Sequence, residues 1–166
     1  NVDKLKFAVF RRIIQVQARQ DKFDDANKLV DGLLKNAPDN WVALELKGWV
    51  QKEAGEFADA AKTYEDVLDK ITKDKKLKDD EKDELAGDIH YILSNVYLEL
   101  KNIDKVTEHL QTLLKKEPEN PTYNNDLGYI WADHDRNLDD AEKLIRKALE
   151  EDRKQQKKKD PDLKDD

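Results

Sequence analysis

A spacing of 34 residues recurs through this chain and limits what it can fold into. The step from Ala26 to Ala60 is 34 residues, and the same step joins Ile14 with Gly48, Val30 with Tyr64, Leu33 with Val67, and Ser94 with Gly128. The step from Ala60 to Val106 is 46, and the step from Val106 to Ala141 is 35. Self-similarity at a fixed period of this length is typical of stacked repeats. The sequence therefore predicts four similar units, with an insertion between the second and the third.

The apolar residues of these units follow the period of an α-helix. Positions i, i+3, i+4 and i+7 are apolar in three stripes, formed by Leu29, Val30, Leu33 and Leu34, by Tyr64, Val67, Leu68 and Ile71, and by Leu110, Leu113 and Leu114. Only 5 Gly and 4 Pro interrupt the chain, and no run of alternating apolar residues is long enough for a strand. We therefore expect an all-α fold of helix–turn–helix units.

The units resemble tetratricopeptide repeats, whose pattern is W-x2-L-G-x2-Y, then A-x3-F, then P. The second unit matches at Leu44, Gly48, Gly55, Phe57, Ala60 and Tyr64, the third at Leu93, Ser94, Tyr97, Val106, Leu110 and Pro118, and the fourth at Leu127, Gly128, Trp131, Ala141, Ile145 and Ala148. The first matches at Phe23, Ala26, Val30, Leu33 and Pro38, but Ile14 stands where a small residue is expected and Gln17 where an aromatic is. The resemblance implies a right-handed α-solenoid of about four stacked repeats, because one repeat alone buries too little surface.

The pattern also predicts where the repeats begin and end. We expect a repeat domain over residues 5–153, with repeats at about 7–40, 41–72, 87–120 and 121–153 and an insertion at about 69–88. The insertion should extend one helix, turn near residues 73–80 and start the next helix early, either as a solvated loop or as a contact surface. The charged segment 154–166 should be disordered or act as a linker.

Composition excludes several classes of function. The chain has no Cys, so disulfides, thiol catalysis and thiolate metal sites are excluded. The net charge of -7 disfavours nucleic-acid binding, which requires a basic stripe for phosphate contact. No apolar run approaches the roughly 18 residues of a membrane span, so we expect no membrane insertion but a soluble protein of the cytoplasm or the periplasm. The turn sequences resemble those of bacterial repeat proteins.

Residues with catalytic or metal-binding chemistry do not form a recognisable site. Ser94 is the only serine, and the repeat pattern places it at a close-packed position between helices. The three histidines, His90, His109 and His134, share no helix at i, i+4 spacing. Asp133, Asp135 and Asn137 imitate a calcium loop, but Leu138 and Leu144 replace its required Gly and Glu. We therefore predict a protein without catalytic residues, metal or cofactor.

The resemblance implies that the first helices of successive repeats line a concave groove that holds a peptide or a helix of another protein. The predicted groove residues are Arg11, Gln15 and Arg19, then Glu45, Trp49 and Lys52, then Tyr91, Asn95 and Glu99, and finally Asn125, Tyr129 and Asp133. The asparagines can bond a peptide backbone through both a donor and an acceptor. The aromatic residues provide rigid anchors of the kind that dominates binding energy.

Charge is distributed unevenly along this groove. Residues 1–20 carry five bases and one acid, which leaves the rest of the chain at -11. Relatives that clamp an acidic C-terminus use Lys and Asn where this chain has Arg11 and Gln15, so we expect no such clamp. We instead expect a ligand that is acidic near Arg11 and Arg19 and basic near Glu99 and Asp133.

The sequence thus predicts a non-catalytic scaffold for protein–protein interaction. Two alternatives remain open. In the first, the terminal repeats stack end to end, and the chain is a homo-oligomerising assembly module. In the second, the chain is a regulatory or docking segment of a larger multidomain enzyme.

Overall fold

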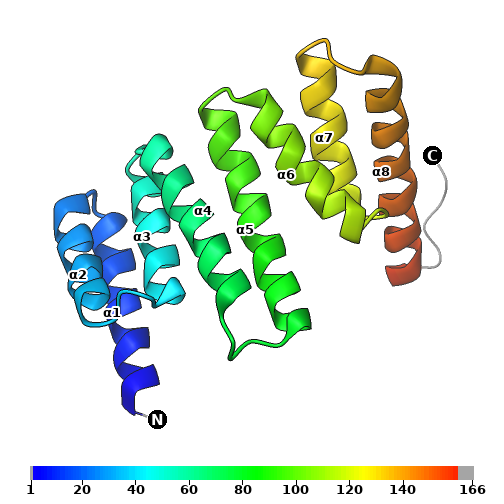
Figure 1. Ribbon diagram of the computed structural model, residues 1–166. Coiled ribbons are helices and arrows are strands. Elements are labelled where there is room, and N and C mark those ends of the chain that lie inside the picture. Colours follow the sequence, from blue (N-terminus) through cyan, green and yellow to red (C-terminus); the bar gives the residue numbers. More distant parts are fainter. Residues whose placement is uncertain (1, 161–166) are drawn as a thin grey trace. The chain divides into compact units, whose positions relative to one another are not determined.

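The computed structural model describes residues 2–160, in which the backbone forms eight α-helices and no strand (Figure 1). The helices are α1 (Val2–Ala18), α2 (Phe23–Asn36), α3 (Trp41–Glu53), α4 (Phe57–Lys73), α5 (Asp79–Glu99), α6 (Ile103–Lys116), α7 (Pro121–Asp133) and α8 (Leu138–Lys159). This confirms the all-α prediction. We call α1, α3, α5 and α7 the first helices, and α2, α4, α6 and α8 the second helices, of the repeats.

Contacts divide the chain into two compact units, each larger than one repeat. From here on, the first unit is the one that ends at Lys101, and the second unit is the one that begins at Asn102. Helices α1 to α5 form the first unit, where α2 packs on α1 and α3, and α4 packs on α3 and α5. Helices α6 to α8 form the second unit, where α7 packs on both α6 and α8. The boundary falls between the two helices of the third predicted repeat.

The core of the first unit begins where α1, α2 and α3 meet. Its buried residues are Ile14, Ala18, Ala26, Val30, Leu46 and Val50, and Phe23, Leu29, Leu33, Leu34 and Trp49 pack against them. Ile14, which stands where the repeat pattern expects a small residue, is fully buried in this cluster. The stripes read from the sequence therefore face the core.

Two glycines allow paired helices to approach closely. A Cβ atom on Gly48 would lie 3.0–3.2 Å from the ring of Tyr64 on α4. A Cβ atom on Gly128 would lie 2.9 Å from the Ala141 carbonyl oxygen and 2.8 Å from Cγ1 of Ile145 on α8. A side chain at Gly128 would meet the backbone of α8, and a side chain at Gly48 would press against the Tyr64 ring, which explains the small residues in the repeat pattern.

Asparagine residues begin two of the first helices. The Oδ1 atom of Asn40 accepts hydrogen bonds from the backbone N–H groups of Val42 and Ala43, and Asn120 caps α7 in the same way. Side-chain caps of this type satisfy N–H groups that have no partner within the helix. The turn before each of these helices is thus fixed by local hydrogen bonds.

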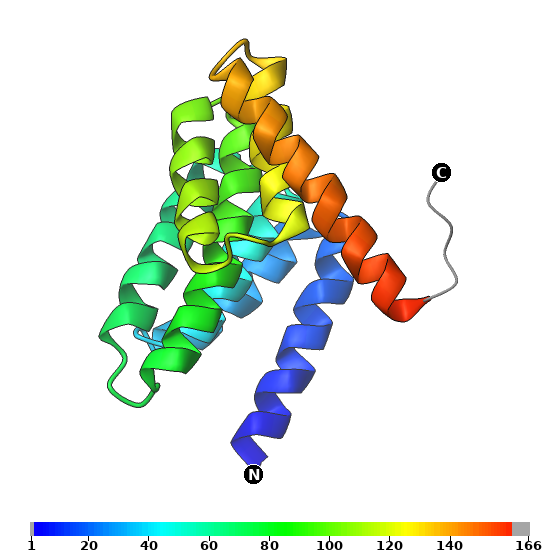
Figure 2. The same cartoon turned by 90° about the vertical axis from the view of Figure 1, so that its right-hand side faces the viewer.

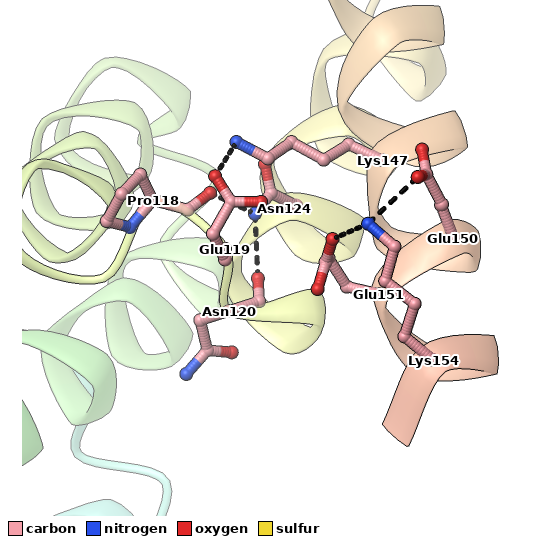
Figure 3. A network of polar contacts seen from close by, with 8 residues as sticks. All are labelled: Pro118, Glu119, Asn120, Asn124, Lys147, Glu150, Glu151 and Lys154. Carbon is pink, nitrogen blue, oxygen red and sulfur yellow. Dashed lines mark hydrogen bonds and ion pairs between the residues drawn. The ribbon is translucent and has the colours of Figure 1, made fainter. Parts of the chain in front are cut away.

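A polar network also holds the start of α7 (Figure 3). Buried Asn124 donates from Nδ2 to the carbonyl oxygens of Pro118 and Asn120, at 2.9 and 2.8 Å. Lys147 on α8 pairs with Glu119 at 2.8 Å. The turn between α6 and α7 is therefore held to α7 through Asn124 and to α8 through Lys147.

Most of segment 69–88 is helical. Helix α4 continues to Lys73, and α5 begins at Asp79. The connection is tied down, because Trp41 donates from Nε1 to Asp74 at 3.2 Å and Lys82 donates to the Thr72 carbonyl oxygen at 3.1 Å.

The expected disorder of segment 154–166 is wrong for its first part, because α8 continues to Lys159 (Figure 2). Lys154 pairs with Glu150 and Glu151 one turn earlier, at 2.9 and 2.7 Å. The last turn carries three lysines, whose positive charges interact favourably with the negative end of the helix dipole. Residues 161–166 lie outside the described residues. No helix between residues 2 and 160 is long and apolar enough to span a membrane.

Candidate functional site

The predicted groove residues of the first unit lie on three helices and one turn. Arg11 and Gln15 are on α1, and Arg19 lies just after that helix. Glu45, Trp49 and Lys52 are on α3, and Tyr91, Asn95 and Glu99 are on α5. Because α1 contacts α3, side chains from two repeats meet in one place: the Arg11 guanidinium lies 3.8 Å from the Glu45 carboxylate.

The carboxyl group of Glu45 is partly buried beside Arg11. Burial raises the pKa of its carboxyl group above the ordinary value, and the nearby charge of Arg11 offsets this only in part. Burial raises the pKa of the Tyr64 phenol as well, and the charges of Glu45 and Glu53 add to this effect. The Arg11–Glu45 contact therefore does not fully compensate the cost of burying the carboxylate, in keeping with a long pair whose cation is half exposed.

Three predicted groove residues from two helices line one hollow of about 330 Å³. We call it the Asn95 hollow; its lining residues are Lys52, Glu53, Phe57, Asn95, Val96, Leu98 and Glu99. The ammonium of Lys52 is 2.9 Å from the Glu53 carboxylate, so one edge carries both charges. The structure therefore brings Lys52, Asn95 and Glu99 together beside apolar Phe57 and Leu98.

Asn95 is exposed and keeps capacity to bind. Its Nδ2 atom donates to the Tyr91 carbonyl oxygen at 2.9 Å. An amide side chain has two N–H donors and an acceptor oxygen, so this one bond does not exhaust it. Asn95 can thus still donate to and accept from a peptide backbone.

Trp49 occupies a more structural position than the groove prediction suggests. Its ring is half-buried and packs against the cluster around Ile14 and Leu46. Only part of the indole is therefore available for a ligand, and truncating it would open the core of the first unit.

The three predicted residues of the second unit share one face of α7. Tyr129 is 63% exposed, whereas Phe10, another exposed aromatic residue of the described chain, is 39% exposed. Asn125 lines a hollow of about 310 Å³ between α7 and α8, together with Pro121, Thr122, Asp126, Ala148, Leu149 and Asp152. Asp133 is exposed and lies 3.6 Å from His134. This surface combines an aromatic ring, an amide and a carboxylate.

The residues with reactive side chains are engaged in structural contacts. Ser94 is buried and donates from its hydroxyl group to the Tyr91 carbonyl oxygen at 2.7 Å. Asn137 adopts the left-handed conformation, with φ 43° and ψ 45°, and starts α8 as expected of a turn residue. Among residues 2–160, no group of His, Asp and Glu side chains could hold a metal ion.

Sequence reasoning missed several residues that line these hollows. Phe57 and Leu98 line the Asn95 hollow, and Asp126 and Asp152 line the hollow of the second unit. The repeat pattern marked Phe57 only as a packing residue. Leu98 directly precedes the predicted groove residue Glu99, and this adjacency is the signal that the sequence offers.

The arrangement of helix pairs agrees with a comparison of the sequence with protein families. The tetratricopeptide repeat family matches residues 12–75 and 108–156, more than half of the chain. The chain belongs to this family. Tetratricopeptide repeat proteins act as scaffolds that bind other proteins or peptides, and this general role is supported for the chain. No curated protein matches the sequence.

Solved structures of tetratricopeptide repeat proteins share the fold. MamA RS-1, as an ArsTM double mutant, has a TM-score of 0.68 and 21% identity, over 88% of this chain and 75% of MamA. MamA MSR-1 C2 has a TM-score of 0.64 and 15% identity, over 89% and 77%. YrrB, described as a tetratricopeptide repeat protein with an unusual peptide-binding site, has a TM-score of 0.64 and 17% identity, over 86% and 67%. These similarities show a fold of stacked helical repeats.

Proposed function

We propose that this chain is a non-catalytic scaffold that binds a segment of another protein along its first helices. The observation that carries the proposal is the Asn95 hollow, where α3 and α5 present Lys52, Asn95 and Glu99 to solvent around an apolar patch. The resemblance to tetratricopeptide repeats assigns these same three residues to the groove. Their convergence supports a shared ligand.

The chemistry of the hollow indicates the kind of segment that fits. Asn95 can pair with a peptide group, and Phe57 and Leu98 offer apolar surface to a side chain of the ligand. Lys52 and Glu99 carry opposite charges, so a segment with charges of both signs fits better than a uniformly acidic or basic one. A ligand bound here would be an extended peptide or one face of a helix.

The second unit offers a surface that also combines an aromatic ring, an amide and a carboxylate. Tyr129 projects into solvent on the face that also carries Asn125 and Asp133. Exposed tyrosine is a frequent anchor in protein interfaces because it buries a large rigid ring and retains a hydroxyl group. We infer that this face of α7 contributes a second contact to the partner.

The proposal is tested by placing a photo-crosslinking amino acid at position 95 and irradiating the protein in a cell lysate. The matched control carries the same group at Lys62, an exposed position on α4. We expect position 95 to capture a discrete partner that position 62 does not capture. Competition with the double variant Asn95→Ala/Tyr129→Ala, whose helicity is checked by circular dichroism, should be weaker than competition with wild type.

Two results would contradict groove binding. Position 62 could capture the same partner as position 95 with equal yield. Alternatively, the folded double variant could compete as well as wild type. Trp49 is left unchanged in this experiment because its ring packs on the core.

A further inference from the structure

The chain builds one kind of stacking contact three times, between a second helix and the next first helix. Helix α2 contacts α3, α4 contacts α5, and α6 contacts α7. A polar pair marks each contact: Asp31 with Lys47 at 2.9 Å, Glu65 with Tyr97 at 2.5 Å, and Thr107 with Trp131 at 3.0 Å. The faces that meet are therefore known on both helix types.

Helix α1 has the face for such a contact, but no second helix of the first unit covers it. Val9, Phe10, Ile13 and Val16 are between 39% and 50% exposed. The positions equivalent to Val9, Ile13 and Val16 are buried or half-buried on the other first helices, at Ala43, Lys47 and Val50, at Ile89, Leu93 and Val96, and at Tyr123, Leu127 and Ile130. The apolar side of α1 thus matches the sides of α3, α5 and α7 that pack on a preceding second helix.

On α8, an apolar residue is exposed at a position that is covered on the other second helices. One leucine recurs at the same position of every second helix, eight residues after Ala26, Ala60, Val106 or Ala141: Leu34, Leu68, Leu114 and Leu149. The first three are half-buried, whereas Leu149 is 66% exposed. Leu149 also borders the hollow of about 310 Å³ between α7 and α8. Leu149 therefore lacks the cover that the equivalent leucines have on α2, α4 and α6.

We propose that α1 of one copy docks on α8 of a second copy, so that copies stack head to tail. The docked α1 would place Ile13 and its apolar neighbours against Leu149 and the hollow beside it. The hollow beside Leu149 includes Asn125, one of the predicted groove residues, but the contact between copies needs no bound partner and does not rest on the proposed function.

Charge favours a second copy as the occupant. The hollow beside Leu149 is lined by Asp126 and Asp152, whereas α1 carries Lys6 and Arg12 on its exposed surface. Within the second unit, Asp104 pairs with Arg136 across α6 and the turn after α7. The position equivalent to Asp104 on α8 is Asp139, and the position equivalent to Arg136 after α1 is Lys22. These two residues also carry opposite charges. The α1 helix of a second copy therefore provides both apolar side chains and positive charges that complement the surface beside Leu149.

A contact between two different faces leaves one face of each kind free on every assembly. Such heterologous contacts extend into open chains unless the rotation closes a ring. We therefore expect the mass of the particle to grow with concentration beyond a dimer.

The test is light scattering or sedimentation over a concentration series, starting from a monomer of 19.4 kDa. Ile13→Asp and Leu149→Asp each place a charge in the proposed contact at an exposed position, so both variants should fold, as circular dichroism would verify. Each should remain monomeric, with an affinity for itself about tenfold or more below that of wild type. The control Gln155→Asp adds the same charge to another side of α8 and should assemble like wild type.

An equimolar mixture of the two variants gives the decisive result. The Ile13→Asp chain keeps a functional α8 face, and the Leu149→Asp chain keeps a functional α1 face, so the mixture should form a dimer and nothing larger. A wild-type chain that stays monomeric up to its solubility limit would overturn the proposal. So would a mixture that stays monomeric, or a Leu149→Asp chain that assembles as wild type does, since that result would mean that α1 pairs with α1.

Discussion

Single residues decide how closely the paired helices approach. We predict that Gly128→Ala lowers the free energy of unfolding by about 1–3 kcal/mol, because the new methyl group would meet the Ala141 carbonyl oxygen, which cannot move aside. Gly32→Ala provides the matched control, since no atom lies within 4 Å of its Cβ position in the middle of α2. That change should stabilise the protein by about 0.5–1 kcal/mol. Urea denaturation of the two variants would measure the difference, and equal effects would show that the close approach at Gly128 is unimportant.

Burial of the carboxylate of Glu45, a predicted groove residue, should lower the stability of the fold. Its pKa in the folded protein is raised above the ordinary value of 4.5, so the carboxylate is destabilising at pH values above that raised pKa. The carboxyl group stabilises the fold at pH values below its unfolded pKa, and this contribution is lost as the pH rises through the folded pKa. Glu45→Gln should therefore make the protein more stable than wild type at neutral pH.

The difference between Glu45→Gln and wild type should shrink as the pH falls toward 4, because wild type then becomes protonated. Thermal unfolding at a series of pH values measures this trend. Glu56→Gln, at an exposed position, is the control for the chemical change from Glu to Gln itself. A variant less stable than wild type at neutral pH would mean that the contact with Arg11 outweighs the burial of the carboxylate.

At the scale of the element, helix starts are fixed by short polar signals. Asn120→Ala should destabilise the second unit by about 1 kcal/mol, because the N–H groups of Thr122 and Tyr123 lose their acceptor. Asn120→Ser retains an acceptor oxygen and should recover most of this loss. Circular dichroism during urea denaturation tests the pair of variants. Equal stability of the Ala and Ser variants would assign the effect to the bond between Asn120 and Glu117 instead.

The sequence predicts the helices well because each one depends on local signals and on a period that repeats. Gly48, Gly128 and Ala141 mark close approaches that the structure confirms. The end of α8 is different, since its residues are charged side chains that pair one turn apart, such as Lys154 with Glu150. Charge blocks of this kind look disordered when only composition is considered.

The candidate site was less predictable than the helices. A repeat pattern assigns residues to a face but does not give the depth of a side chain. It could not distinguish half-buried Trp49 from highly exposed Tyr129, because that difference depends on neighbouring helices. The hollow around Asn95 likewise requires Phe57 from the start of α4, whose position follows only from the packed structure.

At the scale of the whole molecule, charge and repetition act together. Residues 1–20 have a net charge of +4, while the remainder has -11. The apolar face of α1 is thus set in a basic segment, and the rest of the chain provides acidic surface. This distribution favours contacts in which unlike ends meet, whether the other end belongs to a partner or to a second copy.

The last prediction concerns the direction in which a partner lies along the first helices. Once a peptide has been captured at position 95, Arg19→Glu and Glu99→Lys should each weaken its binding by about three- to tenfold, and the affinity should fall as salt is added. Arg19 is chosen over Arg11 because reversing Arg11 would place a carboxylate beside Glu45. Isothermal titration calorimetry at two salt concentrations measures both effects, with Lys62→Glu as the control on α4. If affinity is unchanged by salt and by both reversals, the peptide is held by its apolar and amide contacts alone, and the charge of the chain does not orient it.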